Sequence, residues 1–208
     1  MGESLIEAIR SRRSVRGFRR KGVPLELVRK VLQVATCAPS AHNAQPWRFV
    51  VVKESSVKRR LAEAMAKAYD SDLRRDGAPK EMRERLTKAS VLRLTEAPIL
   101  IVACLTMEGM DRYPDRRRKV VELVMATQSL SAAVQNLLLA AHAMGLGTCW
   151  LCAPLFAPRV VRGVLKIPGA FKPQAFILLG YPDETPKAPE RLPLDEIVCF
   201  DGWCAKGP

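Results

Sequence analysis

A cluster of arginines near the N-terminus has the composition of an anion-binding site. The motif Arg12-Arg-Ser-Val-Arg16 places three guanidinium groups and one hydroxyl within five residues. A guanidinium group binds phosphate through two parallel hydrogen bonds, and the Ser14 hydroxyl can donate another. A basic run is equally typical of a solvated helix end. The motif by itself therefore leaves two interpretations open, a phosphate site and a solvated surface.

A second polar segment spans residues 38–47, Ala-Pro-Ser-Ala-His-Asn-Ala-Gln-Pro-Trp. Loops at the edge of a rigid scaffold commonly carry ligand contacts. The alternative is a capped turn in which Ser40 or Asn43 satisfies the backbone and Trp47 anchors a strand. His42 could line a substrate pocket, whereas His142 on an apolar helix is interpreted as a core or interface histidine. Neither is assigned a role in proton transfer.

The six cysteines contain one pair with metal-like or redox-like spacing, Cys149 and Cys152. A structural zinc site needs a second pair, and Cys199 with Cys204 fits that pattern only loosely. A redox dithiol is expected at the start of a helix, but this pair lies in a strand-like segment. We therefore interpret these cysteines as packing residues and predict no metal site.

The charge balance favours anionic ligands. The chain has 34 basic and 21 acidic residues, for a net charge of +13. That excess suits nucleic acid, a membrane surface or a phosphorylated small ligand. Aromatic residues make up 6% and do not alternate with basic ones as a base-stacking surface requires. No apolar run approaches the ~20 residues of a membrane span, and the N-terminus lacks an apolar signal core. From the residues alone, nucleic acid and a phosphate-bearing small ligand stay equally open. We expect a cytoplasmic protein without membrane partners, and the family resemblance described below implies no nucleic-acid partner.

The apolar periodicity predicts one domain over residues 1–208, in which helices and strands alternate. A capping box, Ser4-Leu-Ile-Glu7, begins the first helix. The expected helices cover residues 5–12, 24–38, 55–67, 120–144 and 158–165, and the expected strands cover 47–53, 98–104, 148–151 and 174–180. The charged stretch 69–93 is expected to form solvated helices or a mobile cover, residues 111–119 a charged connection, and the proline-rich tail from Tyr181 an extended segment.

Four segments together resemble the nitroreductase family of flavoenzymes. They are Arg12-Arg-Ser-Val-Arg16, Ala38-Pro-Ser-x-x-Asn-x-Gln-Pro-Trp-x-Phe-Val-Val51, Gln135-Asn-Leu-Leu-Leu-Ala-Ala-His-Ala-Met-Gly-Leu-Gly-Thr148, and Gly180-Tyr-Pro with Arg191-Leu-Pro. They occur in the order of the family and span about residues 5–198. Residues 149–156 and Met110-Asp-x-Tyr-Pro are most similar to the nitroreductase-type domain of coenzyme F420 biosynthesis proteins.

The resemblance implies a fold and an assembly. The expected fold is α+β, with a central mixed β-sheet flanked by helices. The expected assembly is an intertwined, obligate homodimer that binds two FMN molecules at the subunit interface. The apolar helix 120–144 would belong to the dimer core, and the tail from about residue 181 would wrap the partner subunit.

The resemblance also implies site residues. Arg12, Ser14 and Arg191 would hold the FMN phosphate, with Arg13 in the same motif. Arg16 would lie near flavin N1 and O2, where a cation stabilises the negative charge that reduction develops. The remaining expected contacts are the loop residues Pro39, Ser40, Ala41 and Asn43 from the other subunit, the backbone of Leu151, Cys152 and Ala153 beside flavin N5, and Ser90 and Arg93 beside the pyrimidine. Which amide faces N5 stays open, because Pro154 has no N–H.

The expected function is that of an FMN-dependent oxidoreductase. Reduced nicotinamide, or reduced F420, would deliver hydride, and a nitroaromatic, quinone, flavin or unsaturated metabolite would accept it in a ping-pong mechanism. No catalytic side chain is expected beyond Arg16, because the cofactor carries the chemistry. The alternatives are a reductase of a dehydro-F420 precursor, a non-catalytic flavin-binding protein, and a basic nucleic-acid-binding module.

Overall fold

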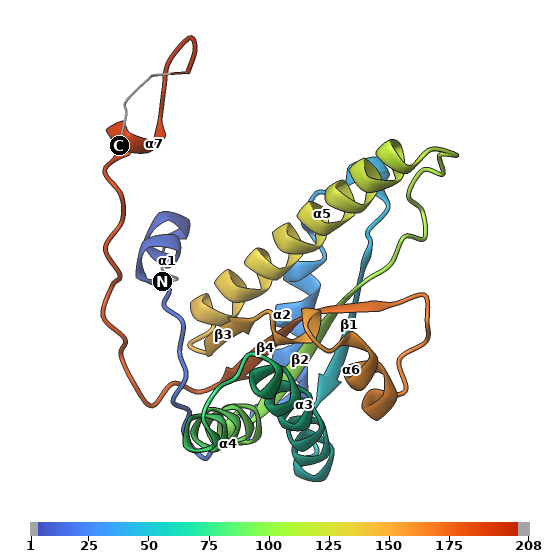
Figure 1. Cartoon of the computed structure of the whole chain (residues 1–208). Coiled ribbons are helices and arrows are strands. Elements are labelled where there is room, and N and C mark those ends of the chain that lie inside the picture. Colours follow the sequence, from blue (N-terminus) through green and yellow to red (C-terminus); the bar gives the residue numbers. More distant parts are fainter. Residues whose placement is uncertain (1–3, 204–208) are drawn as a thin grey trace.

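The computed structural model describes residues 4–203, so Met1 and Cys204 lie outside the described residues. The order of elements is α1 (Leu5–Ser11), α2 (Leu25–Ala35), η1 (Ala41–Asn43), β1 (Trp47–Val52), α3 (Ser55–Arg75), α4 (Lys80–Glu96), β2 (Ile99–Leu105), α5 (Arg116–Ala143), β3 (Gly147–Leu151), η2 (Ala153–Leu155), α6 (Pro158–Leu165), β4 (Lys172–Gly180) and α7 (Leu194–Ile197). The predicted α+β class is confirmed (Figure 1).

The sheet has four strands in the order β1-β2-β4-β3, and every pairing between these strands is antiparallel. The prediction of a mixed sheet is therefore wrong for the strands of the described chain. Its one parallel pairing is an isolated bridge between Ser14 and Thr148. The central strand β2 is buried along its whole length, as its continuous apolar sequence predicts.

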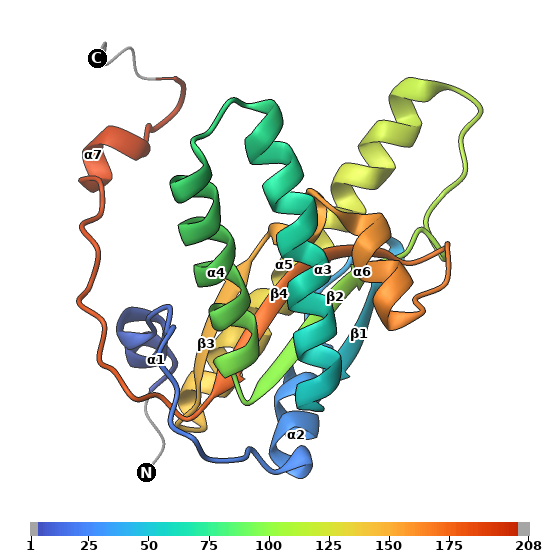
Figure 2. The same ribbon diagram turned by 60° about the horizontal axis from the view of Figure 1, so that its bottom comes forward.

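Helices cover both faces of the sheet and form two apolar cores. One core joins α2 and α5 to the sheet, and the other joins α3, α4 and α6 to the opposite face. Figure 2 shows α3, α4 and α6 in front of the strands, with α5 behind them. The strand edge near β3 therefore lies between two helical layers.

The boundaries of several elements differ from the predictions. The capping box at Ser4 and Glu7 is present. However, α3 continues to Arg75, where the sequence predicted an end near Lys67, because ion pairs of Asp70 with Arg74 and of Asp72 with Arg75 support its last turns. Likewise α5 begins at Arg116, because the Asp115 side chain accepts a hydrogen bond from the Arg118 N–H and caps the helix. The tail is extended except for the short helix α7.

A buried lysine fixes the end of α4. The Lys58 amino group donates to the carbonyl oxygens of Ala97, of Pro98 at 3.2 Å and of Thr95 at 3.5 Å, although Lys58 is only 4% exposed. These carbonyls follow or end the helix and have no partner within it. Burial lowers the pKa of Lys58. Its contacts hold the last turns of α4, which carry Ser90 and Arg93, against α3.

The two halves of α5 have different surroundings. The second half is buried against the sheet, whereas Val120, Val121 and Val124 in the first half are 48–51% exposed. By length and composition, α5 is the one helix of residues 4–203 that could cross a membrane, and 44% of its most apolar window is buried inside the protein. A core helix passes the same test, so the finding is weak evidence for a span.

Candidate functional site

The arginine motif lies in extended conformation beside strand β3. The Val15 N–H donates to the Thr148 carbonyl at 2.9 Å, and Ser14 forms the parallel bridge with Thr148. Val15 is buried and packs so closely on Gly147 that a Cβ there would lie 2.8 Å from it. Because side chains alternate along an extended chain, Arg12, Ser14 and Arg16 share the side opposite to Val15. The local sequence thus presents two cations and a hydroxyl on one side.

Positive charges from separate segments converge on this edge. Burial raises the pKa of the Cys149 thiol on β3, and the charges of Arg16, Arg93 and Arg12 oppose that rise. Burial also lowers the pKa of Arg12, and the positive charges of Arg13 and Arg191 lower it further. We refer to Arg12, Arg16, Arg93 and Arg191 as the cationic cluster. Such a concentration of guanidinium groups favours an anionic ligand.

Arg13 differs from its neighbours. Its Nη1 donates to the carbonyl oxygens of Arg10 at 2.5 Å and Arg12 at 2.9 Å, and so satisfies the end of α1. The Arg13 guanidinium group is thus hydrogen-bonded to the backbone, whereas the guanidinium groups of Arg12 and Arg16 form no hydrogen bond within the described residues.

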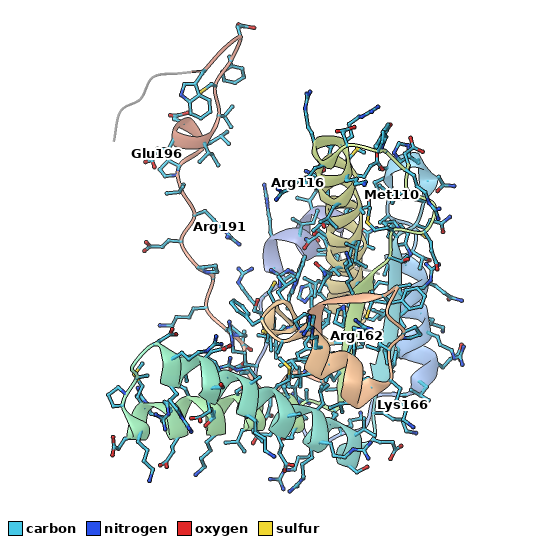
Figure 3. The ribbon with its side chains drawn as sticks, turned by 45° about the vertical axis from the view of Figure 1, so that its right-hand side comes forward. Met110, Arg116, Arg162, Lys166, Arg191 and Glu196 are labelled. Atoms are coloured by element: carbon cyan, nitrogen blue, oxygen red, sulfur yellow. The ribbon has the colours of Figure 1, made fainter. Side chains whose placement is uncertain are left out.

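A carboxylate from the tail supports the motif. Glu184 Oε1 accepts the backbone N–H groups of Arg16 at 2.5 Å and Gly17 at 2.8 Å. These two hydrogen bonds, followed by the charge of Arg16, hold the pKa of Glu184 below its usual value. Beyond this point the tail leaves the sheet, and Figure 3 shows Arg191 on the part that stands apart from the body. Glu184 therefore fixes the beginning of the tail to the arginine motif.

A cavity of ≈640 Å³ lies next to the cationic cluster. Ser90 and Arg93 of α4 line it together with Leu151 at the end of β3 and Cys152 and Ala153 after it, so the structure brings these predicted site residues together. The lining also includes Tyr69, Asp72, Asp76, Trp150 and Phe156. Sequence reasoning did not assign these residues to the site. The residues of α3 carry no motif, and the 149–156 motif, which contains Trp150 and Phe156, was used for the family resemblance. Those two aromatic residues were the available signal.

The loop residues Pro39, Ser40, Ala41 and Asn43 do not line this cavity. The Ala41 N–H donates to Ser129 Oγ at 3.1 Å, which ties η1 to α5 instead. Ser40 Oγ accepts the Gln45 N–H at 3.0 Å. His42 and Asn43 have positive φ angles of 56° and 50°, an uncommon conformation for residues other than glycine. Within residues 4–203 the loop and the cationic cluster are thus separate features.

The remaining candidates from the sequence are the cysteines and His142. Cys149 is buried on β3, and Cys152 is exposed at the cavity, so they do not form the paired site that their spacing allowed. Cys204, the partner considered for Cys199, is not described. Ser11 Oγ lies 2.7 Å from His142 Nε2, which links α1 to α5 and agrees with a satisfied histidine.

Comparisons with known proteins agree with the fold. The model of the nitroreductase family matches residues 9–181. A putative NADH dehydrogenase/NAD(P)H nitroreductase of Methanothermobacter thermautotrophicus is 30% identical over 195 residues, which cover 93% of this chain and 85% of the relative. Among solved structures, a BluB-like flavoprotein from Clostridium difficile 630 is 28% identical with a TM-score of 0.83, covering 96% of this chain and 99% of that one.

A putative nitroreductase from Desulfovibrio desulfuricans, solved in complex with FMN, is 26% identical with a TM-score of 0.72 and covers 98% and 100% of the two chains. The match of the family model spans the arginine motif, both helical layers and all four strands. The chain belongs to the nitroreductase family.

Proposed function

We propose that this protein is an FMN-dependent NAD(P)H oxidoreductase whose cofactor lies in the ≈640 Å³ cavity, with its phosphate on the cationic cluster. The observation that carries the proposal is the convergence of Arg12, Arg16 and Arg93 beside a largely apolar cavity. This donor set fits FMN, because guanidinium groups match a phosphate and an apolar lining matches a flat ring system. The FMN in the Desulfovibrio relative supports the same cofactor.

Each group of residues has a distinct part in this proposal. Arg12 and Arg191 bind the phosphate, and the Ser14 hydroxyl donates a further hydrogen bond. Arg16 provides a positive charge near the ring, and the backbone at the end of β3, at Leu151, Cys152 and Ala153, donates to the ring edge. FMN, when bound, supplies the hydride chemistry. The chain binds and orients it, excludes water and stabilises developing negative charge.

For the electron donor and the electron acceptor we propose a chemical class of molecule. A reduced nicotinamide is the donor, in agreement with the name of the Methanothermobacter relative. The acceptor is a small nitroaromatic, quinone, flavin or unsaturated metabolite that uses the same site after the oxidised donor leaves. Reduced F420 as donor, and a dehydro-F420 precursor as acceptor, remain a second hypothesis from the 149–156 motif.

We further propose that the active form is a homodimer in which the loop of Pro39, Ser40, Ala41 and Asn43 completes the site of the second copy. Apolar side chains are exposed on three elements of one chain: Leu5, Ile6 and Ile9 on α1, Val120, Val121 and Val124 on α5, and Leu192, Leu194, Ile197, Phe200 and Trp203 on the tail. Exposed apolar surface on this scale marks an interface. Obligate interfaces often bury more than about 2,000 Å².

The proposed function is tested on the purified protein. Its absorbance spectrum is recorded, the released cofactor is identified by mass spectrometry, and the protein is titrated anaerobically with NADH, NADPH and reduced F420. We expect stoichiometric FMN and reduction by a nicotinamide, followed by steady turnover with an acceptor. Stoichiometric FAD, or no flavin after reconstitution, would exclude the proposal. Bound FMN without turnover would favour the non-catalytic alternative.

A further inference from the structure

An almost fully buried carboxylate lies in the first half of α5, outside the proposed FMN cavity. Glu122 is 3% exposed, and its Oε2 accepts the Asp111 N–H at 3.2 Å. The same oxygen lies 3.4 Å from His42 Nε2. A carboxylate removed from water to this extent is costly unless positive charge and hydrogen bonds compensate it.

A second carboxylate increases the negative charge at this point. One oxygen of Asp111 lies within 4.8 Å of ligand atoms on both His42 and Glu122. No lysine or arginine of residues 4–203 lies within ion-pair distance of either acid. His42 is thus the one basic side chain of the described residues within ion-pair distance of Glu122. Arg112, Lys119 and Lys172 line the adjoining cavity without such a contact to either acid, so a bound cation would compensate the two carboxylates directly.

Three separate segments bring the cluster together. His42 comes from η1, which the hydrogen bond between Ala41 and Ser129 ties to α5. Asp111 directly follows Met110, which Figure 3 places in the connection beside α5, and Glu122 comes from α5 itself. A ligand at this point would join the loop, the connection after β2 and the helix.

The types and spacing of the donor atoms match a particular class of ligand. One imidazole nitrogen and two carboxylate oxygens suit borderline divalent metals such as Zn²⁺. Ligand atoms 2.0–2.2 Å from a tetrahedral metal lie about 3.5 Å apart, and His42 and Glu122 already lie 3.4 Å apart. An oxygen of the exposed Asp111 side chain lies within 4.8 Å of both, and Asp111 Oδ2 also accepts the Tyr113 hydroxyl at 3.4 Å.

We propose that His42, Asp111 and Glu122 bind one divalent transition-metal cation, with Zn²⁺ as the probe. Three protein ligands leave one coordination position open. A cavity of ≈480 Å³ adjoins the cluster and gives water or a small ligand access to that position; its lining includes Asp111, Glu122, Tyr113 and the basic residues Arg112, Lys119 and Lys172. The site depends on none of the residues assigned to the FMN phosphate.

The experiment uses the full-length, flavin-loaded protein after dialysis against a chelator. Zn²⁺ binding is measured by calorimetry, and the ligands are identified from the visible absorption of the Co²⁺-substituted protein. We expect one cation per chain bound through nitrogen and oxygen. His42→Ala and Glu122→Gln should each weaken binding at least about tenfold, the range found even for residues that only support a metal ligand.

Two matched controls isolate the cluster. Glu108→Gln removes an exposed carboxylate that pairs with Arg48 instead, and His142→Ala removes the other histidine of the chain. Both should bind Zn²⁺ like the parent protein. If Glu122→Gln does not fold, His42→Ala and Asp111→Asn at exposed positions carry the test.

Three results would overturn the site: no saturable binding, binding that His42→Ala leaves unchanged, or a sulfur-to-cobalt charge-transfer band that indicates cysteine ligands. Because metal binding is measured directly, its failure leaves the proposed oxidoreductase activity unaffected, and a lack of turnover leaves the metal site unaffected.

Discussion

The cationic cluster beside β3 and the loop at residues 39–43 are both predicted to contact one cofactor, yet they lie in different surroundings within one chain. The cluster is assembled within one chain by the 12–16 segment, α4 and the tail, beside a cavity. The loop instead contacts α5 through the hydrogen bond from Ala41 to Ser129. The first half of the same helix carries exposed valines. One chain thus supplies one side of the proposed site, and we propose that a second copy supplies the other.

The largest expected effect comes from breaking the contact between copies. Replacing both Val121 and Val124 by Asp on the exposed face of α5 should abolish the dimer, because it buries unpaired charge in an apolar interface. FMN binding should be lost with it, although the cationic cluster is untouched. Light scattering and flavin retention on a sizing column measure both effects.

The matched control is Met82→Asp on α4, which is 42% exposed and lies outside the apolar surface of α1, α5 and the tail. It should leave the assembly and the flavin content unchanged. A double variant that stays folded, monomeric and fully loaded with flavin at micromolar concentration would show that one chain completes the site.

A smaller effect distinguishes two neighbouring arginines within the cluster. Arg12→Ala should weaken FMN binding by about 1.5–3 kcal/mol, the usual contribution of a charged hydrogen bond, or roughly 10- to 150-fold. Arg13→Ala should have much less effect, because its guanidinium bonds the carbonyls of Arg10 and Arg12. Fluorescence titration of the apoprotein with FMN measures both constants. Equal losses would mean that Arg13 turns to the phosphate when the cofactor binds.

The sequence predicted the elements well where local signals were strong. Ser4 and Glu7 define the start of α1, the apolar run 98–104 predicts a buried strand, and Gly145, with a φ of 74°, follows the end of α5. The mixed sheet was predicted wrongly, because strand direction depends on connections whose geometry no local pattern encodes. The start of α5 was missed because Asp115 caps the helix at the end of a charged stretch that resembles a loop.

The candidate site was predictable only in part for a related reason. Motifs identified Arg12, Ser14 and Arg16, since they are neighbours in sequence. The cavity wall from α3 and the contacts of Glu184 arise from tertiary packing. The cluster of His42, Asp111 and Glu122 joins a histidine to two acids 69 and 80 positions further along the chain and could not be seen in sequence.

The link between the tail and the arginine motif gives a further prediction. Glu184→Ala removes the acceptor of the Arg16 and Gly17 amides, so their hydrogen exchange should accelerate about tenfold. Glu190→Ala, an exposed acid on the same tail, should not change it. In the parent protein the pKa of Glu184 is lowered, so its stabilising contribution is complete above the usual value of 4.5 and is lost as pH falls through the lowered pKa. Unchanged exchange in Glu184→Ala would mean that the tail is held elsewhere.

The smallest expected effect concerns Arg16 and separates binding from chemistry within the cluster. The phosphate keeps its charge when the flavin is reduced, so Arg12→Ala should leave the midpoint potential of bound FMN nearly unchanged. Arg16 is proposed to lie near N1 and O2, where negative charge develops on reduction. Only an interaction that is stronger in the charged state favours its formation. Arg16→Ala should therefore lower the midpoint potential and slow reduction even at saturating FMN.

Redox titration can resolve this difference, because about 1.4 kcal/mol corresponds to about 30 mV for a two-electron couple. Glu184 lies beside Arg16 and carries the opposite charge, so Glu184→Gln, which keeps an acceptor oxygen, should shift the potential upward. The opposite signs of these two shifts are the informative result, since a general disturbance of the cavity would not move the potential in both directions. An Arg16→Ala protein that loses FMN as Arg12→Ala does, while its bound flavin keeps the parent potential, would place Arg16 on the phosphate and leave the ring without a cation from this motif.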